Sequence, residues 1–63
     1  DTVIMRLWGR AFDATKIIMI GDVNGAVAIH MSTGDTFQLL GGTADEAIQA
    51  WEDAMNQWYE AAT

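Results

Sequence analysis

The sequence predicts an α+β fold: a small antiparallel sheet of about four strands, followed by one C-terminal amphipathic helix packed on one face of the sheet. Two observations predict it. Short β-branched and apolar segments alternate with turn signals up to residue 42. A well-marked helix start then opens a segment with a helical period. The chain has 63 residues, 51% of them hydrophobic and 19% charged, so we expect a single domain over residues 1–63.

The expected strands follow from alternation and from the turns between them. Residues 2–8, TVIMRLW, alternate as a strand does, and GRAFDAT at 9–15 breaks the pattern. The apolar run KIIMI at 16–20 leads to GDVNG, in which Asn24-Gly25 is suited to the positive φ angles of a tight hairpin turn. AVAIHM is the returning strand, and TFQLL follows after the turn STGD.

The helix is expected from Thr43 to near Ala62. Thr43 and Glu46 have the spacing of a capping box, in which each side chain binds a free backbone N–H of the first turn. An apolar stripe with a 3.6-residue period faces the sheet as core, and its members are Ile48, Trp51, Met55, Trp58 and Ala62, with Ala44 and Ala47 beside them.

The sheet is expected to have two apolar faces. One faces the helix and consists of Val3, Met5, Leu7, Ile17, Met19, Val27, Ile29, Phe37 and Leu39. The other is a candidate oligomer face, made of Ile4, Trp8, Ile18 and Ile20. Two interpretations are open. In one, this second face is an interaction surface through which the chain forms homo-oligomers. In the other, the strand that carries KIIMI is central and the loop at 9–15 folds over this face with Phe12 as a plug.

Charge limits the classes of partner. The net charge is −6, and the three basic residues, Arg6, Arg10 and Lys16, lie in the first quarter of the chain. Binding to DNA or RNA needs cationic side chains that displace phosphate counterions, so we expect no direct nucleic-acid contact and no anionic membrane contact. No apolar run reaches the length of a membrane helix or a signal peptide. The absence of cysteine is compatible with the cytoplasm, where we expect the protein.

Catalytic chemistry is not expected. His30 is the only histidine, and Ser32 sits in a turn two residues away. A triad needs a nucleophile, a base and an orienting carboxylate in mutual reach, and nothing in the sequence arranges them, so no triad is indicated. GDVNG has a fragment of a calcium-loop pattern without its closing glutamate. Glu52 and Asp53 are adjacent and point about 100° apart on a helix, which is a poor carboxylate pair. We therefore predict no enzyme, no catalytic residue, no metal and no cofactor.

The polar side of the helix carries acids and no basic residue. Acids at its start favour the helix dipole, but those in the middle gain nothing from it, and no Glu–Lys pair is available. We therefore interpret this side as a contact surface for a basic protein partner, made of Asp45, Gln49, Glu52, Asp53, Asn56 and Glu60. The alternative is a merely solvated face in an acidic protein.

The passage GGTADEAIQAWEDAMNQW resembles the strand-to-helix passage of HicB-type antitoxins, in which a Thr-x-x-Glu-Ala helix follows a short meander. The resemblance covers about residues 25 to 60 and does not extend to the family's later strand or DNA-binding tail. In size and charge the chain is also similar to phage-encoded inhibitors of bacterial defence, including anti-CRISPR proteins. We assign it to neither family.

The expected function is a small acidic protein-binding module: a phage-type inhibitor or antitoxin-like protein that occupies a basic, in some cases nucleic-acid-binding, surface of its target. The alternative is a structural or scaffold subunit that forms homo-oligomers through the second apolar face of the sheet.

Overall fold

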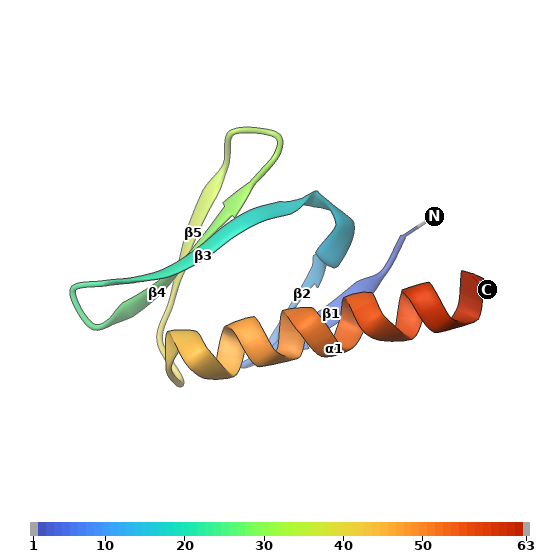
Figure 1. Ribbon diagram of the computed structural model, residues 1–63. Coiled ribbons are helices and arrows are strands. Elements are labelled where there is room, and N and C mark those ends of the chain that lie inside the picture. The colour runs from blue at the N-terminus through green and yellow to red at the C-terminus, as the bar shows by residue number, and fades with distance from the viewer. Residues whose placement is uncertain (1, 63) are drawn as a thin grey trace.

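The computed structural model describes residues 2–62, and their side chains through residue 61. The predicted α+β class with a C-terminal helix is confirmed (Figure 1). The elements in chain order are β1 (Ile4–Leu7), β2 (Arg10–Asp13), the short 3-10 helix η1 (Ala14–Lys16), β3 (Ile17–Val23), β4 (Ala26–Met31), β5 (Thr36–Leu39) and α1 (Ala44–Ala62). All strand pairs are antiparallel, but they form two sheets, β1-β2 and β3-β4-β5, instead of one.

The additional strand is β2, in a segment expected to be a loop. Trp8 and Gly9 both adopt left-handed φ angles, 45° and 83°, which is the conformation of a two-residue hairpin turn. The chain therefore reverses at once, and Met5 pairs with Phe12 across the hairpin. Phe12 is buried, but it belongs to a strand and packs in the main core, and its ring lies 5.7 Å from that of Phe37 on β5. It does not cover the second apolar face, where Ile4 and Ile18 stay exposed.

The second hairpin turn is confirmed. Asn24 and Gly25 have φ angles of 52° and 82°, and they connect Val23 directly to Ala26. The third connection, between β4 and β5, is longer and closes with a hydrogen bond from the Met31 N–H to the Asp35 carbonyl oxygen at 2.8 Å.

An irregularity in β3 changes which side chains face the core. Ile17 pairs with Met31 and Met19 pairs with His30, so one residue of β3 has no partner on β4. Such a bulge reverses the alternation beyond it. Ile17 and Ile20 both point inward, whereas Ile18 and Met19 are 65% and 53% exposed. The expectation that Ile20 faces away from the helix, and Met19 toward it, was therefore wrong.

The core lies where α1 crosses the two sheets (Figure 1). Its buried side chains come from every element, and they are Met5, Leu7, Phe12, Ala14, Ile17, Ile20, Val27, Ile29, Leu39 and Ala47. Among its described side chains the helix contributes one residue to the buried set, Ala47, and this small side chain allows the helix to approach β1, β3, η1 and β4 closely. The expected stripe member Ala62 lies outside the described side chains. Larger helix residues, including Ile48, Trp51 and Met55, pack around the edge of the core. Trp58 is half-buried but is not among the residues that pack on this cluster.

Two tryptophans connect distant parts of the chain. The indole of Trp8 lies against Gly41 and Gly42, the two residues between β5 and the helix cap. A Cβ atom on Gly42 would come within 2.6 Å of Cε2 of that indole, so any larger residue there requires the ring to shift. The indole N–H of Trp51 donates a hydrogen bond to the carbonyl oxygen of Ala14 at 3.0 Å, which fixes α1 to η1.

Candidate protein-binding surface

The helix that carries the predicted surface begins at a complete capping box. The backbone N–H of Thr43 donates to Oε1 of Glu46 at 3.1 Å, and the N–H of Glu46 donates to Oγ1 of Thr43 at 3.2 Å. Two of the first-turn donors that a helix leaves free are thus satisfied. The expected start of the helix is confirmed, and the position of every later residue around the helix axis follows from it.

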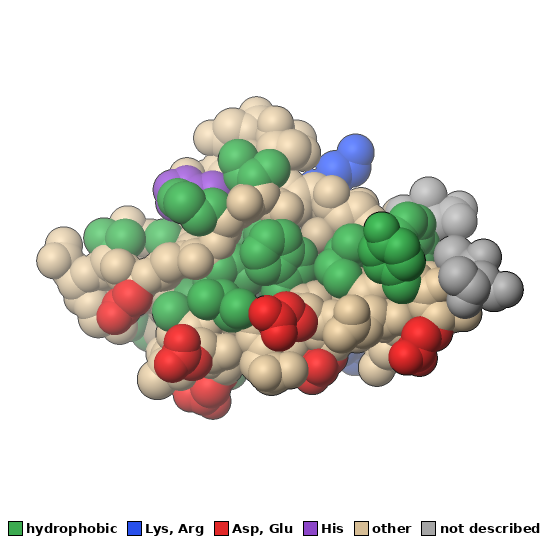
Figure 2. Space-filling view, viewed as in Figure 1, with side chains coloured by type: hydrophobic (Ala, Val, Ile, Leu, Met, Phe, Trp, Pro, Cys, Tyr) green, Lys and Arg blue, Asp and Glu red, His purple; other side chains and the backbone are tan. Residues whose placement is uncertain are grey.

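All six residues of the predicted contact surface are exposed, and they are Asp45, Gln49, Glu52, Asp53, Asn56 and Glu60. At about 100° per residue they span an arc of about 100° on the side of α1 opposite the buried Ala47. Figure 2 shows acidic side chains along the helix, with hydrophobic side chains between them and the strands above. The positions therefore form one continuous surface, and their contact with a partner stays a prediction.

The charges of this surface are not balanced on the helix itself. α1 carries no lysine or arginine, and the basic residues Arg6, Arg10 and Lys16 belong to β1, β2 and η1. Within the surface, the side-chain amide of Gln49 donates to Oδ1 of Asp53 at 3.0 Å, one helical turn away. This hydrogen bond orders Asp53 without neutralising it.

One flank of the acidic surface borders a shallow hollow of about 330 Å³. Two neighbouring i, i+4 rows of the helix line it: Trp51 with Met55, and Glu52 with Asn56. The first row is apolar and the second is acidic and polar. The hollow thus has an apolar side and a hydrogen-bonding side along the same two helical turns.

The other flank borders a groove of about 460 Å³ between α1 and β1. Asp53 and Gln57 line it from the helix, and Ile4 and Arg6 line it from the strand. Although Glu52 and Asp53 are adjacent in sequence, they border different depressions. Of the two depressions that flank the acidic surface, the groove bordered by Asp53 contains a basic side chain of the protein, Arg6, and the hollow bordered by Glu52 contains none.

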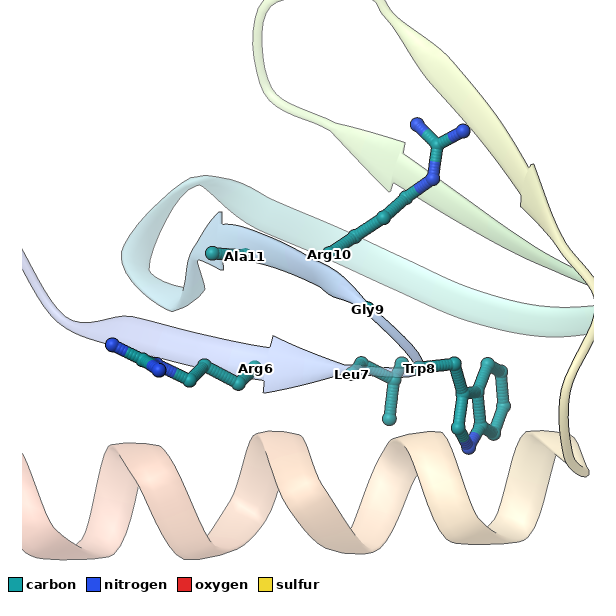
Figure 3. Close-up of a pocket in the computed structure, with 6 residues that line it drawn as sticks. All are labelled: Arg6, Leu7, Trp8, Gly9, Arg10 and Ala11. Carbon is teal, nitrogen blue, oxygen red and sulfur yellow. The ribbon is translucent and has the colours of Figure 1, made fainter.

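A third hollow lies at the tip of the β1-β2 hairpin and is drawn in Figure 3. It contains two basic residues, Arg6 and Arg10, beside the indole of Trp8. The two arginine side chains extend in different directions from the hairpin, one along β1 and the other toward β5 (Figure 3). Their guanidinium groups therefore do not converge on a common position for an anion.

The candidate oligomer face is interrupted in the structure. Ile4 and Ile18 are 56% and 65% exposed, but Trp8 is half-buried and Ile20 is a core residue at 8% exposure. The bulge in β3 is the cause, because it turns Ile20 inward. The exposed apolar neighbours at this point of the strand are Ile18 and Met19.

His30 and Ser32 show no catalytic arrangement in the described residues. Nδ1 of His30 is 3.1 Å from Oγ1 of Thr36, a partner on the adjacent strand, and Ser32 lies in the exposed β4-β5 turn. Among residues 2–61, no three histidine, aspartate or glutamate side chains are grouped as a metal site requires.

The carboxylate of Asp13 stabilises the local structure around η1. It accepts hydrogen bonds from the hydroxyl and the N–H of Thr15, at 2.6 and 3.0 Å, and a longer one of 3.4 Å from the N–H of Val3. The hydroxyl of Thr15 contributes most to lowering the pKa of Asp13 below its ordinary value. The hydrogen bonds cap η1 and hold it to the start of the chain.

No protein-family model, curated protein or solved structure matches the chain. Within residues 2–62, the helix falls short of the combined length and apolar character that membrane crossing requires.

The hollow beside Trp51 is the part of the surface that sequence analysis missed. The signal was present as two adjacent rows with i, i+4 spacing, one apolar and one polar. A helical period predicts that the apolar row is core, but it does not show that Trp51 and Met55 stay half-buried at the edge of the core.

Proposed function

We propose that the protein is a non-enzymatic protein-binding module that docks the acidic side of α1 on a basic surface of a target protein, as an inhibitor or antitoxin-like protein does. One observation carries this proposal: four acids at Asp45, Glu52, Asp53 and Glu60 are exposed along the helix, and the helix has no basic residue. Such a surface raises the association rate with a cationic partner and disfavours anionic ones. A cytoplasmic location belongs to the same proposal, because the chain has no cysteine.

The test compares charge reversals at two places. A target is first captured from a lysate of the source cells and identified, and its affinity is then measured for each variant. Glu52→Lys should slow association and weaken binding, and the double variant Glu52→Lys/Asp53→Lys should abolish it, because attraction becomes repulsion. Asp22→Lys changes the net charge equally at an exposed position on β3 and serves as the matched control.

The expected pattern is a large loss for the helix variants, a small loss for Asp22→Lys, and a steep dependence of the parental affinity on salt. If Glu52→Lys and Asp22→Lys weaken binding equally, only the total charge matters. If the double variant binds as the parent does, the proposal is wrong.

A second candidate function is a subunit that forms homo-oligomers. The exposed pair Ile18 and Met19 on the edge strand β3 favours it, since adjacent exposed apolar side chains on a strand invite pairing with another chain. In that case the parent sediments as a dimer or larger species at micromolar concentration, and Ile18→Lys sediments as a folded monomer.

A further inference from the structure

We propose that the hollow lined by Trp51, Glu52, Met55 and Asn56 receives an arginine side chain of the target protein. This inference rests on the proposed function, because it specifies which chemical group of a basic partner is bound and where. The hollow combines the two kinds of surface that an arginine side chain has: the apolar row matches its methylene stem, and the polar row matches its guanidinium group.

The polar row offers acceptors in the arrangement that a guanidinium needs. The carboxylate of Glu52 and the side-chain carbonyl of Asn56 lie one helical turn apart at the same depression. A guanidinium presents several N–H donors in one plane and binds carboxylates with two parallel hydrogen bonds. Glu52 also supplies the opposite charge, so the hollow is complementary to the group in charge as well as in hydrogen bonding.

The apolar row favours arginine over lysine. The indole N–H of Trp51 is already bonded to the carbonyl oxygen of Ala14, so the indole surface left for a ligand consists of carbon atoms. A guanidinium is weakly hydrated and stacks on aromatic rings, whereas an ammonium keeps its water. The same hydrogen bond fixes the ring in place before binding, which lowers the ordering cost of association.

The size and surroundings of the hollow select this occupant. Its volume of about 330 Å³ lies at the small end of ligand sites, which suits one long side chain and not a cofactor. The other two depressions contain basic side chains of the protein, Arg6 in the groove beside β1 and both Arg6 and Arg10 at the hairpin. Among these three depressions of the described residues, the hollow beside Trp51 is the one with an acidic side chain and no basic one in its lining.

The first test uses a capped Gly-Arg-Gly peptide and the same peptide with citrulline, which replaces the guanidinium by a neutral group of the same shape. The indole N–H resonance of Trp51 is followed in two-dimensional NMR spectra during titration. The arginine peptide should shift this resonance and the backbone amides of Glu52 and Asn56, in the millimolar range. The citrulline peptide should leave them unchanged. Equal shifts with both peptides, or none with either, overturn the proposal.

The second test uses the adjacent acids as matched variants. Glu52→Gln and Asp53→Asn remove the same charge from neighbouring exposed positions, but only Glu52 lines the hollow. Glu52→Gln should weaken binding of the arginine peptide by about three- to fivefold, the range of an exposed charge pair, and Asp53→Asn should have less than half that effect. Equal weakening by both variants overturns the proposal, because the acids then act only through their summed charge.

The outcomes separate this inference from the proposed function. If the target's affinity falls with the helix charge reversals but the arginine peptide does not bind the hollow, the proposed function stands and the arginine site is wrong. If the peptide binds the hollow with the expected selectivity but the target binds the reversed helix as it binds the parent, the site stands and the proposed docking surface is wrong.

Discussion

Substituting alanine for Gly42 should destabilise the protein through a clash with one ring. The φ angle of Gly42 lies outside the left-handed region, so alanine is compatible with the backbone. In open space this change stabilises a protein by about 0.4–1 kcal/mol, because it restricts the unfolded chain. Here the new Cβ would lie within 3 Å of three indole atoms of Trp8, so the ring has to move away.

The magnitude follows from the burial of Trp8. Complete truncation of a buried tryptophan costs about 3–5 kcal/mol, and Trp8 is half-buried, so displacing its ring should cost about 2 kcal/mol. After the gain from the unfolded state is subtracted, the net loss is about 1–1.5 kcal/mol. For a domain of this size that lowers Tm by about 5–10 °C.

The assay is urea denaturation followed by circular dichroism, with two controls. Gly21→Ala is the matched control, because nothing lies within 4 Å of a Cβ at that position and its φ angle is also outside the left-handed region. In a Trp8→Ala background, Gly42→Ala should become neutral or stabilising, since the ring is gone. The reasoning is refuted if Gly42→Ala changes the free energy of unfolding of the parent no more than Gly21→Ala does. It is also refuted if Gly42→Ala destabilises the protein equally with and without the Trp8 ring.

Three further predictions address the core, the strand register and pH. Trp51→Ala should cost about 3 kcal/mol in denaturation experiments, because it removes a half-buried ring from the edge of the core together with its hydrogen bond to Ala14. Trp58→Ala, which does not pack on the buried cluster, should cost about 1 kcal/mol, and equal losses would contradict the observed packing. Ile18→Lys should keep a cooperative thermal transition and Ile20→Lys should abolish it, and the reverse result would mean that β3 has no bulge. Hydrogen bonds lower the pKa of Asp13 in the folded protein. The stability that the Asp13 carboxylate provides is therefore complete above its unfolded pKa and is lost as the pH falls through its folded pKa. Asp13→Asn should flatten the decline of Tm below about pH 4.

The elements with local signals were predictable from the sequence. The helix start depends on two residues three positions apart, Thr43 and Glu46, and both hydrogen bonds of the box form as expected. The turn at Asn24-Gly25 depends on two residues that adopt positive φ angles readily. Each of these signals is contained within a few residues, so no knowledge of the tertiary structure was needed.

The first hairpin was not predictable by the same means. A tryptophan occupies the first turn position, where asparagine, aspartate or glycine is usual, and a bulky residue with φ of 45° is rare. The Trp8 indole packs against Gly41 and Gly42, which are more than 30 residues away in the sequence, and this contact stabilises the turn conformation. The bulge in β3 is likewise defined by the register against β4, which the sequence of β3 alone does not contain.

For the candidate surface, the sequence predicts which side chains are exposed but not which depressions they border. A 3.6-residue period suffices to place Asp45, Glu52 and Asp53 on the outside of α1. It does not show that Glu52 and Asp53 border different depressions, because that depends on how the helix is rotated against β1. The rotation is set by the buried contact of Ala47, which places the larger residues Ile48 and Met55 to one side.

The division of the strands into two sheets has a consequence for local opening. In the part of the chain that the structure describes, no ladder of backbone hydrogen bonds runs from the β1-β2 hairpin into the β3-β4-β5 sheet. The hairpin therefore packs on the rest of the protein mainly through side chains. A two-stranded ribbon is barely stable by itself. Amide hydrogens of β1 and β2 should therefore exchange with solvent deuterium through an opening of the hairpin alone. Amide hydrogens of the central strand β4 should exchange only through global unfolding. The β1-β2 hairpin is thus expected to open at a lower free energy than the three-stranded sheet.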